Sequence, residues 1–329
     1  MTTIERLLPA GFLDASLRAD ARAGLTATPK SLPPKWFYDA EGSALFEKIT
    51  ELPEYYPTRA ERSILHSASS SIADLSGAST LVELGSGSSE KTRLLLSALR
   101  DAQTLRSYVM IDVSEAALLG AGAALTADYP GLEVHAVVSD FEANLGLPPA
   151  QGLAGAPADG PRLVAFLGST IGNMAPGQRS AFLARVRSQL RPGDSFLLGT
   201  DLVKDPAVLV AAYDDTAGVT AAFNKNVLSV LNTALGADFD LDAFDHVAHW
   251  DAEAEWIEMR LRSTAAQSVR VPALGLTVDF ASGEEMRTEI SAKFRRSGVA
   301  SELATAGLEM RSWWTDPAAQ FGLSLSVPA

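Results

Sequence analysis

The chain has 329 residues, a formal net charge of −13 and no cysteine, and 47% of its residues are hydrophobic. This composition is typical of a globular protein with about two domains. The negative charge argues against nucleic acid or an anionic membrane surface as a partner, and the missing cysteine excludes disulfides, thiolate catalysis and cysteine-based zinc sites. Because no secretory segment and no apolar run of membrane-spanning length is recognisable, we expect a cytoplasmic protein. We also expect a monomer without a bound metal.

The first sixty residues are predicted to be mainly helical. Apolar residues recur at helix-like spacing up to about Lys30. Pro33 and Pro34 interrupt this pattern and start a loop. A second break at Tyr55–Arg59 precedes another helical pattern, which contains Ile64.

From residue 81 to residue 200, short apolar strands alternate with helical patterns. The expected strands cover residues 81–84, 107–113, 134–138, 163–168 and 195–200. Strand–helix alternation of this kind predicts an α/β fold with a parallel sheet and helices on both faces. Ligands of such folds bind beyond the carboxyl ends of the strands.

The pattern changes after residue 201. Residues 206–235 are predicted to be helical, and residues 256–262 and 268–271 are predicted to be strands, which indicates a second, substrate-shaping α+β region. Two final strands are expected at 310–314 and 321–327. Residues 146–161 are rich in Gly, Pro and Ala, and we expect a solvent-exposed loop there.

The most informative motif lies at Leu81–Thr92, which predicts a buried strand, a Gly-x-Gly turn and the start of a helix. Glycine lets a ligand approach the backbone closely, and a helix N-terminus offers unpaired amides and a positive dipole end. This geometry suits a cofactor that contains adenosine. Ser88 and Ser89 stand where the dinucleotide fingerprint would have its third glycine. Together with the acidic Glu83, the turn resembles motif I of class I S-adenosylmethionine (SAM) methyltransferases.

Acidic residues follow the next two strands, and each has an alternative interpretation. Asp112 is placed to accept both ribose hydroxyls of the cofactor, but it could instead cap a helix or a turn. Asp140 could accept from the adenine amine while Phe141 lines the base pocket, or Asp140 could be a cap and Phe141 a core residue. Lys91 could contact the cofactor carboxylate or simply be solvated.

A second tight turn follows the strand at 163–168. The segment Phe166–Asn173 contains two glycines and leaves the sheet at the same edge as the Gly85 turn. Asn173 is therefore expected to face the space where a substrate meets the cofactor, and its amide can donate to a carboxylate and accept from an amine. The alternative is an asparagine that serves only the turn geometry.

Eight segments spread through nearly the whole chain are similar to the bacterial L-histidine Nα-methyltransferases of ergothioneine biosynthesis. The resemblance implies SAM as methyl donor and L-histidine as acceptor. It also implies three successive methylations that give Nα,Nα,Nα-trimethylhistidine (hercynine), through mono- and dimethylated forms. The similar segments are Lys30–Asp39, Leu52–Arg59, Glu83–Thr92, Phe166–Asn173, Gly199–Asp205, Tyr213–Asp214, Gly218–Asn226 and Gly283–Ser291.

The resemblance also implies a fold and a set of site residues. The fold is a class I methyltransferase Rossmann-like sheet, covering 61–203 and 293–329, with a substrate-binding α+β domain at 1–60 and 204–292. Cofactor residues would be Gly85, Lys91, Asp112, Asp140 and Phe141. Residues that bind histidine would be Tyr38, Tyr55, Asn173, Tyr213, Met259, Glu289, Ile290 and Ser291. Of these, Tyr38 and Asn173 are expected to act in catalysis, and Ile290 is expected to contribute only its backbone.

These residue types fit the chemistry of the acceptor. Tyr55, Asn173 and Tyr213 can pair with the carboxylate and amine of a zwitterionic amino acid, and Glu289 can accept from an imidazole N–H. A site that pairs a buried polar group rejects analogues that lack it, so Glu289 favours histidine over an apolar amino acid. Without the resemblance, Glu289 would be interpreted as a solvated strand residue. No residue is identified as an obligatory base, and water or a pocket tyrosine would suffice.

Three other functions remain as alternatives. A methyltransferase of the same build could act on another aromatic amino acid such as tryptophan, against which Glu289 argues. A dinucleotide oxidoreductase is disfavoured by the missing third glycine, and a non-catalytic adenosyl-binding module is disfavoured by the full set of acceptor residues. His246 and His249 have the helical spacing of a metal pair but no third ligand, so no metal site is predicted.

Overall fold

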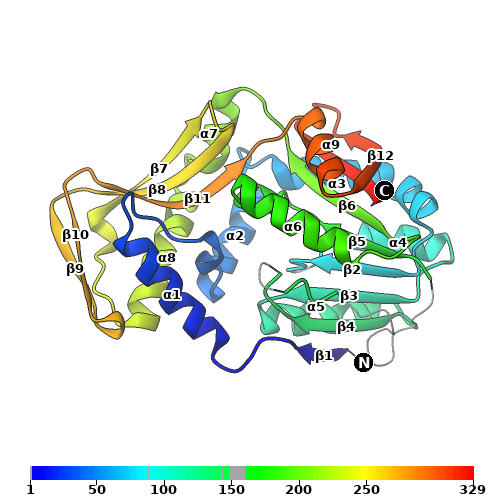
Figure 1. Cartoon of the computed structure of the whole chain (residues 1–329), viewed down its shortest axis with the longest axis horizontal. Helices are drawn as coiled ribbons and strands as arrows, with labels where there is room; N and C mark the ends of the chain where they lie inside the picture. Colours follow the sequence, from blue (N-terminus) through cyan, green and yellow to red (C-terminus); the bar gives the residue numbers. More distant parts are fainter. Residues whose placement is uncertain (1, 88, 142–143, 148–159) are drawn as a thin grey trace. The chain divides into compact units, whose positions relative to one another are not determined.

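The computed structural model describes residues 2–87, 89–141, 144–147 and 160–329 (Figure 1). Most of the loop expected at 146–161 lies outside these residues. The chain divides into two compact units. The first contains Met1–Pro9, Arg59–Leu202 and Phe294–Ala329, and the second contains Ala10–Thr58 and Val203–Lys293.

The first unit is built on an eight-stranded sheet in the order β1-β4-β3-β2-β5-β6-β13-β12, which runs from the dark blue β1 to the red β12 in Figure 1. Strand β13 is antiparallel to β6 and β12, and the remaining strands are parallel to one another. The bounds are β1 (Thr3–Arg6), β2 (Thr80–Leu84), β3 (Ser107–Asp112), β4 (Glu133–Val138), β5 (Arg162–Phe166), β6 (Ser195–Asp201), β12 (Leu308–Thr315) and β13 (Phe321–Pro328). Because β3 and β4 lie on one side of β2 and β5 and β6 on the other, the strand order reverses between β2 and β5.

Helices connect these strands and cover the sheet. They are α3 (Pro57–Ser76), α4 (Arg93–Asp101), α5 (Glu115–Asp128), α6 (Pro176–Gln189), α9 (Arg296–Thr305) and the short 3-10 helix η2 (Thr170–Asn173). Helix α5 packs on β3 and β4, while α9 packs on β12 and α6. Strands β2, β5 and β6 are buried along their whole length, as expected for parallel strands with both faces covered. The predicted α/β fold and its closing hairpin are confirmed.

The N-terminal residues depart from the sequence-based expectation. Residues 3–6 form β1, which pairs in parallel with β4 at the edge of the sheet, where Thr3 lies opposite His135. The predicted helix therefore begins only at Phe12. Residues 1–9, which were expected in the substrate domain, belong to the first unit. An edge strand of four mostly exposed residues carries no apolar alternation that could reveal it.

The second unit combines helices with a three-stranded antiparallel sheet, β11-β8-β7, and a separate hairpin, β9-β10. Helix α8 packs on α2, β7 and β8. The helices are α1 (Phe12–Thr26), α2 (Ala40–Glu51), α7 (Pro206–Tyr213) and α8 (Val219–Leu235), with 3-10 turns η1 (Pro34–Phe37), η3 (Leu241–Ala243) and η4 (Pro272–Leu274). The strands are β7 (Phe244–Asp251), β8 (Trp256–Ser263), β9 (Gln267–Val271), β10 (Leu276–Phe280) and β11 (Glu285–Ala292).

Among the described residues, no helix is long and apolar enough to cross a membrane. His246 and His249, weighed above as a helical pair, both lie on strand β7, where residues three apart point to opposite faces.

Candidate active site

The turn after β2 is wound tightly at the carboxyl end of that strand. Gly85 and Gly87 have φ angles of 69° and 50°, which favour glycine. The Gly85 amide donates to the Ile111 carbonyl at 2.8 Å, and a Cβ on Gly85 would meet Phe141 Cε1 at 3.4 Å. The turn thus lies beside the point where the strand order reverses, which is where ligands of open α/β sheets bind.

Asp112 ends β3 and holds the neighbouring turn in place. Its Oδ2 accepts from the Gly87 amide at 3.0 Å, and its Oδ1 accepts from the Ser114 amide at 2.9 Å. Burial raises the pKa of the Asp112 carboxyl group, against the opposing effect of these two hydrogen bonds. The turn-capping role weighed for Asp112 is therefore present, and each carboxylate oxygen keeps a second lone pair for a ligand.

Asp140 and Phe141 follow β4 at the same edge of the sheet. Asp140 is buried, and Phe141 is half-buried. The Phe141 ring packs edge-on against Phe166, with 5.3 Å between the ring centroids. Phe141 therefore lies between the Gly85 turn and the end of β5.

Two buried carboxyl groups that sequence reasoning did not single out as site residues support this region. Glu83 on β2 accepts from the Thr92 hydroxyl at 2.6 Å and from the Tyr108 hydroxyl, and burial raises its pKa to about 7. These bonds tie the start of α4 to β2. Glu83 was noted only as an acidic residue before the turn, and its sequence position gave no sign of these partners.

Glu61 on α3 is the second of these groups. It forms an ion pair with Lys91, and its Oε1 accepts from the Gly168 amide at 2.8 Å. Lys91 is thus held against the turn that follows β5 rather than merely solvated. Glu61 lies 30 residues before Lys91 and 107 before Gly168, so no local pattern could reveal these contacts.

Asn173 ends η2, just beyond β5. The preceding turn is fixed by Ser169, which has a φ of 57° and accepts from the Asp201 amide at 2.9 Å. Asn173 is half-buried. Within the described part of the chain, its side-chain amide makes no hydrogen bond. Its polar atoms are therefore available to a ligand.

In the second unit, the aromatic residues carried over from the family form one continuous cluster. Tyr38 packs on Phe46 with 5.6 Å between ring centroids, and Phe46 packs on Tyr55 at 6.2 Å. Tyr55 in turn packs on Tyr213 at 6.3 Å. Phe223 of α8 packs on both Tyr38 and Phe46, with 5.4 and 5.9 Å between ring centroids. These segments are far apart in sequence, and the fold brings them together.

A polar network continues from the aromatic cluster. The Tyr213 and Ser291 hydroxyls are 2.7 Å apart. Lys293 Nζ donates to the Tyr213 hydroxyl at 2.9 Å and to Ser291 Oγ at 2.8 Å, and it lies 4.5 Å from the centre of the Tyr213 ring. Lys293, which directly follows β11, was not identified from the sequence, although its spacing of two residues from Ser291 was a possible signal.

Glu289 lies on β11 directly opposite Met259 of β8, so both side chains share one face of the sheet. Only 8% of Glu289 is exposed. Among the residues that the structure describes, none forms a hydrogen bond or ion pair with its carboxyl group. Burial raises the pKa of Glu289 to about 7, and the positive charge of Lys293 opposes this rise.

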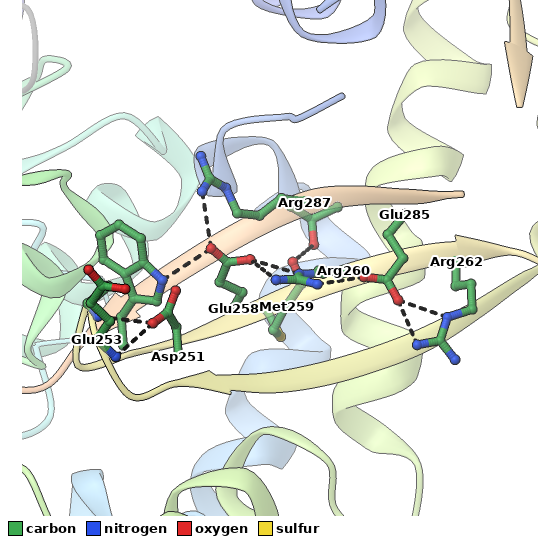
Figure 2. Close-up of polar contacts among 11 residues, drawn as sticks. Asp251, Glu253, Glu258, Met259, Arg260, Arg262, Glu285 and Arg287 are labelled. Atoms are coloured by element: carbon green, nitrogen blue, oxygen red, sulfur yellow. Dashed lines mark hydrogen bonds and ion pairs between the residues drawn. The ribbon is translucent and has the colours of Figure 1, made fainter. Parts of the chain in front are cut away.

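The opposite face of the same sheet carries an ion-pair ladder. Figure 2 shows Glu258 between Arg287 and Arg260, and Glu285 between Arg260 and Arg262. Ile290 pairs with Glu258 in the register and points to this face, away from Glu289 and Ser291. The ladder joins β8 to β11 and so supports the register that sets Met259 opposite Glu289.

Together, the strand order with β13 alone antiparallel, the Gly85 turn and the acidic residue at the end of β3 define a class I SAM-dependent methyltransferase. The chain belongs to the family of SAM-dependent, histidine-specific methyltransferases, whose model matches residues 17–328.

Comparison with individual proteins agrees with this family. The chain is 60% identical over 325 residues to the histidine N-alpha-methyltransferase of Mycolicibacterium smegmatis, covering 99% of each chain. It is 57% identical over 312 residues to the histidine N-alpha-methyltransferase of Mycobacterium tuberculosis, covering 95% of each. A more distant relative is the 4-dimethylallyltryptophan N-methyltransferase of Arthroderma benhamiae, 29% identical over 91% of this chain and 90% of that protein.

Proposed function

We propose that this enzyme transfers methyl groups from SAM to the α-amino group of L-histidine and forms hercynine in three steps, the first reaction of ergothioneine biosynthesis. The observation that carries the choice of acceptor is the Glu289 carboxyl group, which is buried and without a hydrogen-bond partner among the described residues. A buried carboxyl group left unpaired is costly, and an imidazole N–H supplies the missing donor.

The proposed cofactor site uses the residues around the Gly85 turn. The remaining lone pairs of Asp112 accept the ribose hydroxyls, and Asp140 accepts from the adenine amine while Phe141 lines the base. Lys91, which Glu61 holds beside Gly168, keeps N–H donors for the cofactor carboxylate. When bound, SAM supplies an electrophilic methyl group on a sulfonium.

For the acceptor, we assign the polar groups according to the atoms they can satisfy. Tyr55, Asn173 and Tyr213 pair with the carboxylate and the amine of histidine. Tyr38 packs on Phe46, which packs on Tyr55, and we assign Tyr38 to positioning the amine. Met259 packs against the imidazole from its place opposite Glu289, and Ile290 contributes its backbone.

In each methyl transfer, the amine nitrogen attacks the methyl carbon in line with the breaking carbon–sulfur bond. The sulfonium leaves as a neutral thioether, and the nitrogen gains the methyl group. The amine must be unprotonated to attack, and an α-amino group has a pKa of about 8 even in peptides, so water or a pocket tyrosine suffices to take the proton. Alignment of the two reactants supplies much of the acceleration, about 7–11 kcal/mol in favourable cases.

A second candidate is the methylation of another aromatic amino acid, such as tryptophan. It is favoured by the relative of Arthroderma benhamiae, whose name gives a prenylated tryptophan as its acceptor. The indole ring of tryptophan has one N–H but no lone-pair nitrogen, so it offers the site fewer polar partners than an imidazole does. We also propose that the protein is a cytoplasmic monomer, and its net charge of −13 argues against nucleic acid or an anionic membrane surface as a partner.

Calorimetric titration with histidine in the presence of S-adenosylhomocysteine tests the proposal directly. Histidine is expected to bind the unaltered protein, and Glu289→Gln is expected to weaken this binding about 10- to 100-fold. Glu253→Gln, at an exposed position of the same unit, is the matched control. Tighter binding of tryptophan than of histidine would favour the second candidate.

A further inference from the structure

Lys293 is buried next to two residues of the proposed acceptor site. Only 4% of its surface is exposed. Its ammonium donates to the Tyr213 hydroxyl at 2.9 Å and to Ser291 Oγ at 2.8 Å, and the two hydroxyls are 2.7 Å apart. The three groups therefore form a closed triangle of hydrogen bonds, in which either hydroxyl can be the donor to the other.

The protons in this triangle can be counted. An ammonium group only donates, so both oxygens accept from Lys293. The phenol of Tyr213 is more acidic than an aliphatic hydroxyl, and the neighbouring ammonium makes it a still better donor, which favours Tyr213 over Ser291 as the donor between the two hydroxyls. Both lone pairs of Ser291 Oγ are then filled. Its own proton has no acceptor among the described residues, although Ser291 is buried.

We propose that Lys293 is a specificity-determining positioning residue, which holds Ser291 as a hydrogen-bond donor toward the ring of the acceptor. Ser291 and Glu289 are alternate residues on β11, so they share one face about 7 Å apart. Glu289 offers an acceptor and Ser291 a donor. That pair matches a neutral imidazole, which has one N–H and one lone-pair nitrogen on either side of the same ring carbon.

This arrangement discriminates between ring types. Indole has an N–H but no lone-pair nitrogen, so the Ser291 proton would stay unpaired in a buried site. An imidazolium has two N–H groups, one of which would face the Ser291 donor. Without Lys293, Ser291 Oγ regains a lone pair and can rotate to accept, and the site no longer distinguishes these rings. The inference rests on the proposed function, because it assigns a role toward histidine.

The absence of cysteine permits a clean test. A Lys293→Cys variant carries a single thiol. Alkylation in denaturant with 2-bromoethylamine, followed by refolding, rebuilds a side chain of lysine length with its ammonium. Alkylation with 1-bromopropane gives the same length without charge or donors. The unaltered protein, treated in the same way, controls for alkylation elsewhere.

Steady-state kinetics with histidine and with tryptophan are compared for the two alkylated forms. The propyl form is expected to show a histidine KM raised about 10- to 100-fold with kcat within about threefold, the effect of losing hydrogen bonds from a charged donor. Its kcat/KM for tryptophan is expected to stay unchanged or rise. The aminoethyl form is expected to regain the low histidine KM. S-adenosylhomocysteine affinity and melting temperature report that both forms have refolded.

Three results would overturn the inference. A propyl form with an unchanged histidine KM would show that Lys293 does not act on the acceptor. A refolded aminoethyl form that fails to regain the low KM would show that the ammonium is not the active feature. If the unaltered protein does not use histidine at all, the proposed function fails, and the role of Lys293 toward histidine fails with it.

Discussion

Met259 and Glu289 lie directly opposite each other on β8 and β11 and face the same side of the sheet. This places a flexible, apolar thioether beside a buried carboxyl group that has no partner among the described residues. An apolar surface and a single acceptor suit one edge of a flat aromatic ring with an N–H. The ion pairs between β8 and β11 on the reverse face support this register.

Replacing Glu289 by Gln should stabilise the folded protein at alkaline pH and at the same time weaken histidine binding. Burial raises the pKa of Glu289 from 4.5 to about 7, so its neutral form is favoured in the folded state. The contribution of the neutral Glu289 carboxyl group to the free energy of unfolding is present below pH 4.5 and is lost as the pH rises toward 7. At about pH 8, Glu289→Gln is therefore expected to raise the free energy of unfolding, by an amount on the order of 3 kcal/mol, while weakening histidine binding.

Denaturant unfolding at about pH 8 and about pH 5 checks this prediction. The stability gain of Glu289→Gln should shrink at the lower pH. Equal gains at both pH values would mean that the ionised carboxyl group is not destabilising.

Asn173→Ala is expected to raise the histidine KM about 10- to 100-fold, because loss of the side-chain amide would leave polar groups of the substrate unpaired. The side chain makes no hydrogen bond within the described residues, so folding should change little. Titration with S-adenosylhomocysteine should give the affinity of the unaltered protein. Unchanged histidine kinetics in this variant would refute the role given to Asn173.

Asp112→Asn is expected to weaken S-adenosylhomocysteine binding about 10-fold or more. The new amide group must face either the Gly87 or the Ser114 amide, and two donors then oppose each other. Calorimetric titration measures the loss. Asp101→Asn, at an exposed position of the same unit, is the control and should bind the cofactor product normally.

His246 should make the stability of the protein depend on pH in the opposite sense to Glu289. Its Nδ1 accepts from Asn224 at 2.8 Å and its Nε2 donates to the Tyr213 carbonyl at 2.8 Å, a tautomer assigned from these partners. Burial lowers the pKa of His246 from 6.5. The contribution of neutral His246 to the free energy of unfolding is therefore complete above pH 6.5, and it is lost as the pH falls through the lowered pKa.

The measurement is the free energy of unfolding between about pH 7 and about pH 5, for the unaltered protein and for His246→Gln. The difference in stability between the two proteins should narrow as the pH falls. A difference that is constant over this range would exclude titration of His246 as its cause.

The first unit was predictable because its signals are local. Strands β2 and β5 are buried on both faces and read as continuous apolar runs, and the Gly85 turn follows one of them at once. Strand β7 was missed, because its mixture of exposed and half-buried residues gives no clear alternation. The short, mostly exposed edge strand β1 was missed for the same reason.

The partners within the candidate site could not be predicted from spacing. Tyr213 and Lys293 are 80 residues apart, and Glu61 and Gly168 are 107 apart. Only the tertiary fold brings such groups together, because the partners of these buried charged groups are distant in the sequence. Family resemblance named Tyr213, Glu289 and Ser291, but it did not supply Lys293 or Glu61.

The most direct test of the account is mass spectrometry after incubation of the protein with SAM and each common amino acid separately. The account predicts that histidine alone gains methyl groups, up to three, on its α-amino nitrogen. Methylation of another amino acid in preference to histidine would contradict the role of Glu289, and no methylation of any amino acid by protein that binds SAM would contradict the proposed reaction.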